Sequence, residues 1–297
     1  MMADSTAAAG KPQVEKDSRS AEADRESSPS EDGEASSSPS PDALLSLRGI
    51  GKHFGPVTAL DGVNLDIPAG KVTAVVGDNG AGKSTLIKVI AGIHEADHGQ
   101  VFWNGKPVHI RTPHDATDLG IATVYQDLAL CDNLDIVANM FLGAETNRFG
   151  VLKEMPMELR AYETLSDLSV TTIRSIRQPV GSLSGGQRQA VAVARAVMGD
   201  AKLVIMDEPT AALGVSQTAM VVDLIQRLSR NGIAVIVISH NLVDVFAVAD
   251  RIAVVYLGRL VASGPASDFD RQSVVEIMTT GSASAHENGG ADTAGAS

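Results

Sequence analysis

The sequence has a single cysteine, few aromatic residues and no long apolar run, and each scarcity excludes a class of protein. Cys131 has no partner for an internal disulfide, which suits a reducing cytoplasm, and we expect it to be a small packing residue. No apolar run approaches the roughly 18 residues that would span a bilayer, so any membrane association must come through a partner. The first residues lack a basic segment followed by an apolar core, which argues against a secretory signal.

Basic residues are also scarce, because 24 Lys and Arg stand against 36 Asp and Glu, a formal net charge of −12. This balance argues against nucleic acid as the main partner. Residues 1–42 hold ten acidic and four basic residues and almost no Val, Ile, Leu or aromatic side chains. Such a segment cannot bury enough apolar area to offset its chain entropy. We therefore expect disordered tails at 1–42 and 281–297 around one catalytic domain at 43–280.

A glycine-rich loop followed by a lysine and two hydroxyl residues is the most informative stretch. It follows the β-branched run at 71–76, which predicts a buried strand, and precedes an apolar helix that Gly92 stops. Strand, loop and helix in this order predict a nucleotide phosphate site, in which backbone amides face the anion. We expect Lys83 to reach the β- and γ-phosphates, Ser84 to hold Mg²⁺ and Thr85 to complete the cage. The predicted contacts are Gly77, Asp78, Asn79, Gly80, Ala81, Gly82, Lys83, Ser84 and Thr85.

A second glycine motif, Leu183-Ser184-Gly185-Gly186-Gln187, comes later in the chain. One interpretation is a helix start, because Ser184 and Gln187 are spaced as a capping box. A cap does not need two glycines, however, and bare amides at a helix N-terminus suit a γ-phosphate that arrives from a second subunit. These residues resemble the signature of the ATP-binding cassette (ABC) family. The resemblance extends over roughly residues 44–280.

Two carboxylates close an apolar strand at 203–208, at the edge where α/β sheets bind ligands. Asp207 is placed for Mg²⁺, and the resemblance assigns to Glu208 the polarisation of the attacking water. A solvated acidic turn is the alternative. A further strand at 234–238 leads to His240. A histidine at a strand end is usually a polar cap, but the resemblance implies contact with the γ-phosphate and the catalytic glutamate.

The resemblance adds two residues to the site and reveals one departure. Gln126 follows the strand predicted at 121–125 and matches a glutamine that touches Mg²⁺ and the attacking water in this family. Phe54 matches the aromatic residue that stacks on adenine, with a buried structural phenylalanine as the alternative. Gly214 stands where the family commonly has an aspartate that communicates between two ATP sites, so the usual contact is in doubt.

The motif order predicts an α/β fold: a P-loop NTPase core with a mostly parallel sheet, a flanking antiparallel β layer and an inserted α-helical subdomain at about 127–190. The parallel sheet comprises the strands that begin near 71, 121, 203 and 234. The antiparallel layer includes 63–67, 100–103 and 108–110. In the subdomain we expect one apolar helix face formed by Leu159, Tyr162, Leu165 and Leu168.

Two kinds of phosphate-facing motif in one chain imply a head-to-tail homodimer that sandwiches ATP with Mg²⁺. The strings at 77–80, 125–128 and 211–215 resemble the ATPases of bacterial monosaccharide importers. We therefore expect a peripheral ATPase on the cytoplasmic face of the cell membrane, which drives a transmembrane permease fed by a solute-binding protein. The alternatives are a soluble ABC ATPase not tied to transport, a binding module without turnover, and an importer of a non-sugar solute.

Overall fold

A computed structural model describes residues 40–145, 147–148 and 151–282. The tails predicted to be disordered lie outside the described residues, apart from 40–42 and 281–282. The helices are α1 (Lys83–Ile90), α2 (Pro113–Asp118), α3 (Ile136–Phe141), α4 (Glu154–Asp167), α5 (Gly185–Val197), α6 (Val215–Arg230), α7 (Leu242–Val248) and α8 (Arg271–Thr280), with 3₁₀ turns η1 (Val180–Ser182) and η2 (Ala266–Asp268).

The central sheet has the strand order β12-β11-β3-β10-β9-β6. Its members are β3 (Val72–Val76), β6 (Ile121–Val124), β9 (Leu203–Asp207), β10 (Ala234–Ile238), β11 (Arg251–Tyr256) and β12 (Arg259–Pro265). The four predicted strands β3, β6, β9 and β10 are confirmed, and they run parallel. β11 joins them in parallel and β12 closes the edge antiparallel, an extension that the motifs did not predict.

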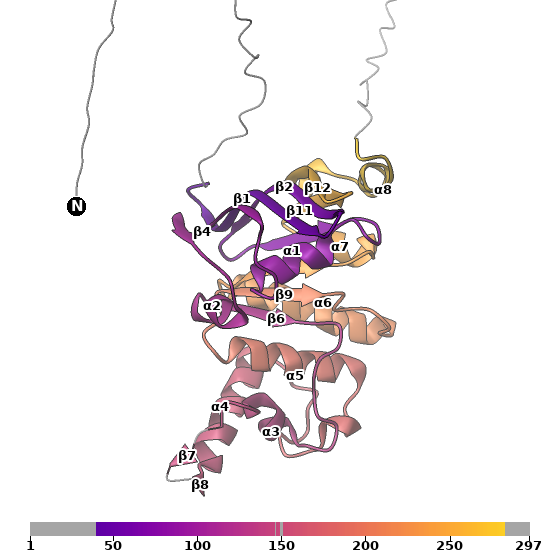
Figure 1. Ribbon diagram of the computed structural model, residues 1–297. Helices are drawn as coiled ribbons and strands as arrows, with labels where there is room; N and C mark the ends of the chain where they lie inside the picture. The colour runs from indigo at the N-terminus through magenta and orange to yellow at the C-terminus, as the bar shows by residue number, and fades with distance from the viewer. Residues whose placement is uncertain (1–39, 146, 149–150, 283–297) are drawn as a thin grey trace, which may run out of the picture. The chain divides into compact units, whose positions relative to one another are not determined.

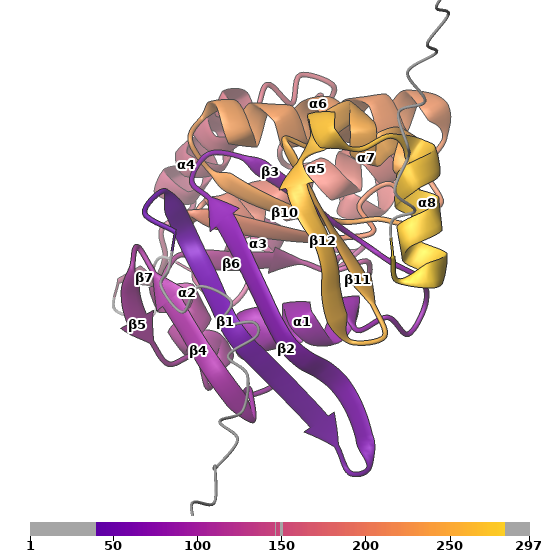
Figure 2. The same cartoon turned by 90° about the horizontal axis from the view of Figure 1, so that it is seen from above.

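The predicted antiparallel layer is also confirmed, with the strand order β2-β1-β4-β5. It comprises β1 (Ala43–Phe54), β2 (Val57–Pro68), β4 (His98–Trp103) and β5 (Lys106–Val108). Figure 2 shows β4, β1 and β2 side by side. The last strand was predicted at 108–110, but the observed strand β5 begins earlier, at Lys106. It follows β4 directly through a tight turn at Asn104 and Gly105, both of which have positive φ.

Successive residues of the central strands face two different cores. Leu203 and Ile205 of β9 pack with α1 and the antiparallel sheet, whereas Val204 and Met206 pack with α5 and α6. In Figure 1, α1 accordingly lies on one side of β9 and β6, and α5 lies on the other. β9 is therefore buried on both faces, and only its carboxyl end reaches a polar environment.

Helices are the main regular structure of the segment from 127 to 190, which contains α3, α4 and the start of α5 and also holds the short pair β7 (Asn147–Arg148) and β8 (Val151–Leu152). The predicted apolar face of α4 was wrong. Leu165 and Leu168 are buried, but Leu159 and Tyr162 are 58% and 64% exposed. Steps of three residues rotate the side chain by about 60° each, so four such positions cannot share one face of an α-helix. The buried face of α4 consists of Met157, Ala161 and Leu165.

Candidate functional site

The predicted catalytic residues lie around one cavity of about 450 Å³ at the carboxyl ends of the central strands. α1 contributes Lys83, Ser84 and Thr85, the phosphate loop contributes Asn79, and β2 contributes Thr58. The carboxyl end of β9 and the loops after β6, β9 and β10 contribute the other polar side chains. The cavity therefore collects residues that are far apart in sequence. They are Lys83, Ser84, Gln126, Asp207, Glu208 and His240.

The glycines of the phosphate loop permit close backbone approaches that no other residue could make. A Cβ on Gly77 would lie 2.2 Å from the carbonyl oxygen of Val255, and a Cβ on Gly82 would lie 2.7 Å from that of Ala59. Gly82 also has a φ of 107° at the N-cap of α1, a conformation that an L side chain rarely adopts. The loop thus packs tightly on β2 and β11 while its outer side faces the cavity.

Lys83 lies within this loop rather than in solvent. Its Nζ donates hydrogen bonds to the carbonyl oxygens of Gly77 at 2.6 Å and Asp78 at 2.8 Å. Burial lowers the pKa of the Lys83 ammonium, whereas the carboxylates of Glu208, Asp78 and Asp207 oppose that shift. The side chain is therefore held, with its charge balanced by acids, where it can exchange carbonyl partners for phosphate oxygens.

The two carboxylates at the end of β9 are held in different ways. Asp207 is the last residue of the strand, and burial raises the pKa of its carboxyl, with the nearby Glu208 carboxylate acting in the same direction. Glu208 has a φ of 49°, which is uncommon outside glycine, and its amide donates to the carbonyl oxygen of Ile238 at 2.9 Å. Such strain is found where the surrounding structure enforces it, often at active sites.

His240 lies beside Glu208, as the sequence predicts. Its Nδ1 is 2.8 Å from Glu208 Oε1. The loops that carry these two residues are joined by Asp244 of α7, a residue that the motif analysis missed. Asp244 Oδ2 accepts hydrogen bonds from Thr210 Oγ1 at 2.7 Å and from Asn241 Nδ2 at 2.9 Å. The only signal in the sequence was the position of Asp244 one helical turn after the histidine.

Phe54 is 43% exposed at the end of β1, so the interpretation of a buried structural phenylalanine was wrong. Its ring meets that of His94 edge-on at 5.1 Å, and Lys52 Nζ lies 5.7 Å from its centroid. Asp97 accepts hydrogen bonds from Lys52 Nζ and the His53 amide, both at 2.6 Å. These bonds fix the strand end that presents Phe54.

Ser184, Gly185, Gly186 and Gln187 do not line this cavity. The predicted capping box at the start of α5 is confirmed, because Ser184 Oγ accepts from the Gln187 amide and Gln187 Oε1 accepts from the Ser184 amide. Any Cβ at Gly185 or Gly186 would press against Leu213 or Gln217. The glycines therefore allow α5 to pack closely on the start of α6, in addition to any ligand contact.

A protein-family model described as ABC transporter matches residues 60–211, about half of the chain. The fructose import ATP-binding protein FrcA of Rhizobium meliloti is 46% identical over 243 residues, which cover 80% of this chain and 94% of that protein. The chain belongs to the ABC transporter family. The xylose/arabinose import ATP-binding protein XylG of Sulfolobus acidocaldarius is likewise 46% identical, over 80% of this chain and 94% of its own.

Solved ATP-binding cassettes share the fold. An ABC transporter cassette in its ADP conformation superimposes with a TM-score of 0.69 at 28% identity, covering 80% of this chain and 95% of that one. A dimeric bacterial ABC transporter cassette superimposes with a TM-score of 0.64 at 25% identity, covering 75% of this chain and 99% of that one. The chain is therefore an ABC ATPase with a nucleotide-binding fold. Among its described residues, no helix combines the length and apolar character needed to cross a membrane.

The donors predicted for Mg²⁺ suit that ion. Ser84, Gln126 and Asp207 offer hydroxyl, carboxamide and carboxylate oxygens, which are the ligands that Mg²⁺ prefers, and all three line the cavity. A divalent cation here would also offset the burial that raises the Asp207 pKa. The described residues hold no group of three or more His, Cys, Asp or Glu that could bind a metal by itself.

Proposed function

We propose that this chain is the ATP-hydrolysing subunit of an ABC importer that energises the uptake of a monosaccharide through a separate membrane permease. The observation that carries the proposal is the meeting of Lys83, Asp207, Glu208 and His240 around one cavity, because this set supports turnover of ATP and not merely its binding. Two relatives at 46% identity, import proteins for fructose and for xylose or arabinose, support the sugar assignment.

We assign nucleotide binding to the phosphate loop and to Phe54. The loop 77–85 surrounds the phosphates through Asn79, Gly80 and residues 82–85, which line the cavity, with Lys83 on the β- and γ-phosphates. The exposed ring of Phe54 stacks on adenine. Stacking accepts any purine face, so we expect only modest selectivity between nucleotides.

Hydrolysis depends on positioning and charge neutralisation. Ser84, Gln126 and Asp207 would hold Mg²⁺, which neutralises phosphate charge when bound. The Glu208 carboxylate orients and polarises the attacking water, and Gln126 helps to position it. His240, 2.8 Å from Glu208, holds that carboxylate in place and contacts the γ-phosphate.

Completion of the site requires a second copy of the chain. Ser184 to Gln187 lie outside the chain's own cavity, so their amides would meet the γ-phosphate bound by a partner in a head-to-tail homodimer. The dimeric form of a solved cassette of 25% identity supports this arrangement. The importer relatives support a peripheral association with a permease. We expect a solute-binding protein to deliver the solute to that permease from the other side of the membrane.

Transport by cells that lack this gene tests the proposal. We expect uptake of one labelled pentose or hexose from a panel to be lost, to return with the wild-type gene, and to stay lost with Lys83→Ala, whose protein should bind ATP weakly. Undiminished uptake of every sugar with loss of another solute would overturn the sugar assignment alone. Purified wild-type protein that does not hydrolyse ATP, with or without its permease, would overturn the ATPase assignment.

A further inference from the structure

The segment that ends the Gln126 loop lies alongside the segment that leads to the Ser184 motif. We refer to residues 131–139 as the sensor segment and to residues 176–183 as the signature segment. Their backbones meet at several points, although the paired residues lie at least 39 positions apart in the sequence. The contacts are an isolated antiparallel bridge between Asp135 and Pro179 and the bonds from Val180 N to Leu134 O at 2.9 Å, from Gly181 N to Asp132 O at 2.9 Å and from Val137 N to Ile176 O at 3.3 Å.

Asn139 makes the sensor segment rigid from within. Its side chain is completely buried and bonds four backbone groups of the same segment. Oδ1 accepts from the Cys131 amide at 2.7 Å, and Nδ2 donates to the carbonyl oxygens of Cys131, Leu134 and Asp135. Because nearly every polar atom of the amide is used, this loop cannot change shape without leaving a buried polar group unsatisfied.

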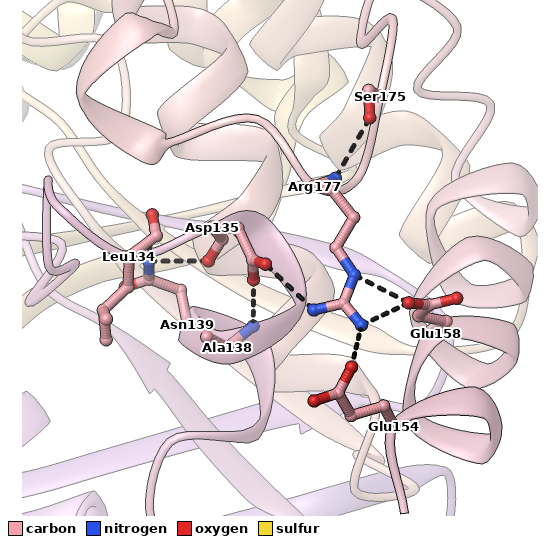
Figure 3. A network of polar contacts seen from close by, with 8 residues as sticks. All are labelled: Leu134, Asp135, Ala138, Asn139, Glu154, Glu158, Ser175 and Arg177. Carbon is pink, nitrogen blue, oxygen red and sulfur yellow. Dashed lines mark hydrogen bonds and ion pairs between the residues drawn. The ribbon is translucent and has the colours of Figure 1, made fainter.

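Arg177 fastens the signature segment to the sensor segment and to α4. Its Nη1 donates to Asp135 Oδ2 at 3.0 Å, while Asp135 also caps α3 by accepting from the Ala138 amide. Its Nη2 bonds Glu154 at 2.9 Å and its guanidinium forms a forked pair with Glu158, with Nε at 2.6 Å. Figure 3 shows the guanidinium lying between these three carboxylates. These acids raise the pKa of Arg177 above its ordinary value, so it stays charged.

Arg188 extends the connection into the first turns of α5. Its Nη1 lies 3.3 Å from Asp132 Oδ1 in the sensor segment, and its Nη2 donates to the carbonyl oxygen of Gly181 at 3.0 Å. The helix that begins with the Ser184 motif is thus bonded to both segments. Nothing in this chain of contacts touches the cavity itself.

We propose that Arg177 is a positioning residue that locks the sensor and signature segments into one body, so that the end of the loop that begins at Gln126 moves together with the Ser184 motif. The inference rests on the proposed function, because it concerns how a nucleotide sensed in one cavity orients the motif offered to the partner's nucleotide. An arginine suits this role, since its planar fork can bind three carboxylates on two elements at once.

Substitution of Arg177 tests the role in the background of Glu208→Gln, where ATP is retained. We expect Arg177→Ala to leave ATP affinity of the monomer within about twofold and to weaken ATP-dependent dimer formation about three- to tenfold, the range for loss of a partly exposed ionic network. Arg174→Ala, an exposed arginine of the same loop, is the matched control and should dimerise normally. Normal dimer formation by Arg177→Ala would overturn the proposal. So would a loss of ATP affinity in the monomer as large as the loss of dimer formation.

A reversible crosslink between the two segments tests the same idea while Arg177 stays in place. A Cβ on Gly181 would lie 3.4 Å from the Cβ of Asp132, close to the spacing of about 3.8 Å in disulfides. We would combine Asp132→Cys and Gly181→Cys with Cys131→Ser and compare ATPase rates before and after reduction. If the segments move as one body, the oxidised and reduced rates agree within about twofold. A rate that rises several-fold on reduction would mean that the segments must separate, and would overturn the proposal. The wild-type rate, measured in parallel, tests the proposed ATPase function separately.

Discussion

Replacing Glu208 with glutamine should stop hydrolysis while leaving the site assembled. The glutamine amide has the size of the carboxylate, and its oxygen can keep the 2.8 Å contact with His240 Nδ1. The backbone bond from residue 208 to Ile238 O is unaffected, because it involves only main-chain atoms. What disappears is the negative charge that polarises water. Removal of such a general base costs about 10²- to 10⁴-fold in rate, or roughly 3–5 kcal/mol of activation free energy.

ATP binding should survive the same change. The Glu208 carboxylate is, after burial, the largest contributor to the raised pKa of Asp207. Without it, the pKa of Asp207 moves toward its ordinary value, so this carboxyl remains ionised over a wider range of pH. We therefore expect ATP·Mg²⁺ affinity to be unchanged or improved, and the ATP-bound dimer to accumulate because it is no longer hydrolysed.

Phosphate release and light scattering after gel filtration measure the two effects in parallel. Glu163→Gln, which changes an exposed glutamate of α4, is the control and should hydrolyse ATP at the wild-type rate. A Glu208→Gln protein that hydrolyses ATP within tenfold of wild type would refute the assignment of the catalytic carboxylate. A protein that stays monomeric with ATP·Mg²⁺, alone and with its permease, would refute the sandwich dimer.

Three further predictions follow from local geometry. Gly82→Ala should lower the melting temperature more than Gly62→Ala. Both substitutions force a side chain into positive φ, which costs about 1–2 kcal/mol, but only at residue 82 would the Cβ lie 2.7 Å from a carbonyl oxygen. Equal decreases in melting temperature would contradict the close packing at Gly82. Asp97→Asn should lower the melting temperature at pH 6. The hydrogen bond from Lys52 depresses the Asp97 pKa from 3.8 to about 2, so the stability that the ionised carboxylate contributes is present above pH 4 and is lost as the pH falls toward 2. The difference in melting temperature between wild type and Asp97→Asn must therefore narrow between pH 4 and pH 2. Asp244→Ala removes the hydrogen bond from Thr210 that connects the Glu208 loop to α7, together with the local bond from Asn241. It should lower kcat about three- to thirtyfold without changing ATP affinity; an unchanged kcat would reject that role.

The central fold and the cavity could be predicted from the sequence because their signals are local. Each of the four predicted parallel strands is a short apolar run that leads into residues of the candidate site, as in 203–208 and 234–240, so the strand and the site are encoded together. Gly77 and Gly82 likewise mark backbone positions where a side chain cannot fit.

The residues that connect the motifs could not be predicted, because their partners are distant in sequence. Arg177 meets Asp135 across 42 positions, and Asp244 meets Thr210 across 34, in both cases on loops or helix ends whose approach only the tertiary structure sets. The positive φ of Glu208 also has no local signal, since a glutamate does not favour it. The error at Leu159 arose for a related reason, because a spacing of three residues was taken for a helix face.

Gly214 shows how this cassette orders the loop after Glu208 without the usual aspartate. Residue 214 is the N-cap of α6, and it offers no side-chain acceptor; its carbonyl oxygen instead accepts from the amides of Gln217 and Thr218, both at 2.9 Å. The polar anchor of the loop lies earlier, at Thr210, which bonds Asp244 of the same chain. The loop is therefore held from within its own subunit. In a dimer, residue 214 can contribute only backbone groups to the facing site, so communication between two sites at this point must depend on the position of the loop and not on a carboxylate.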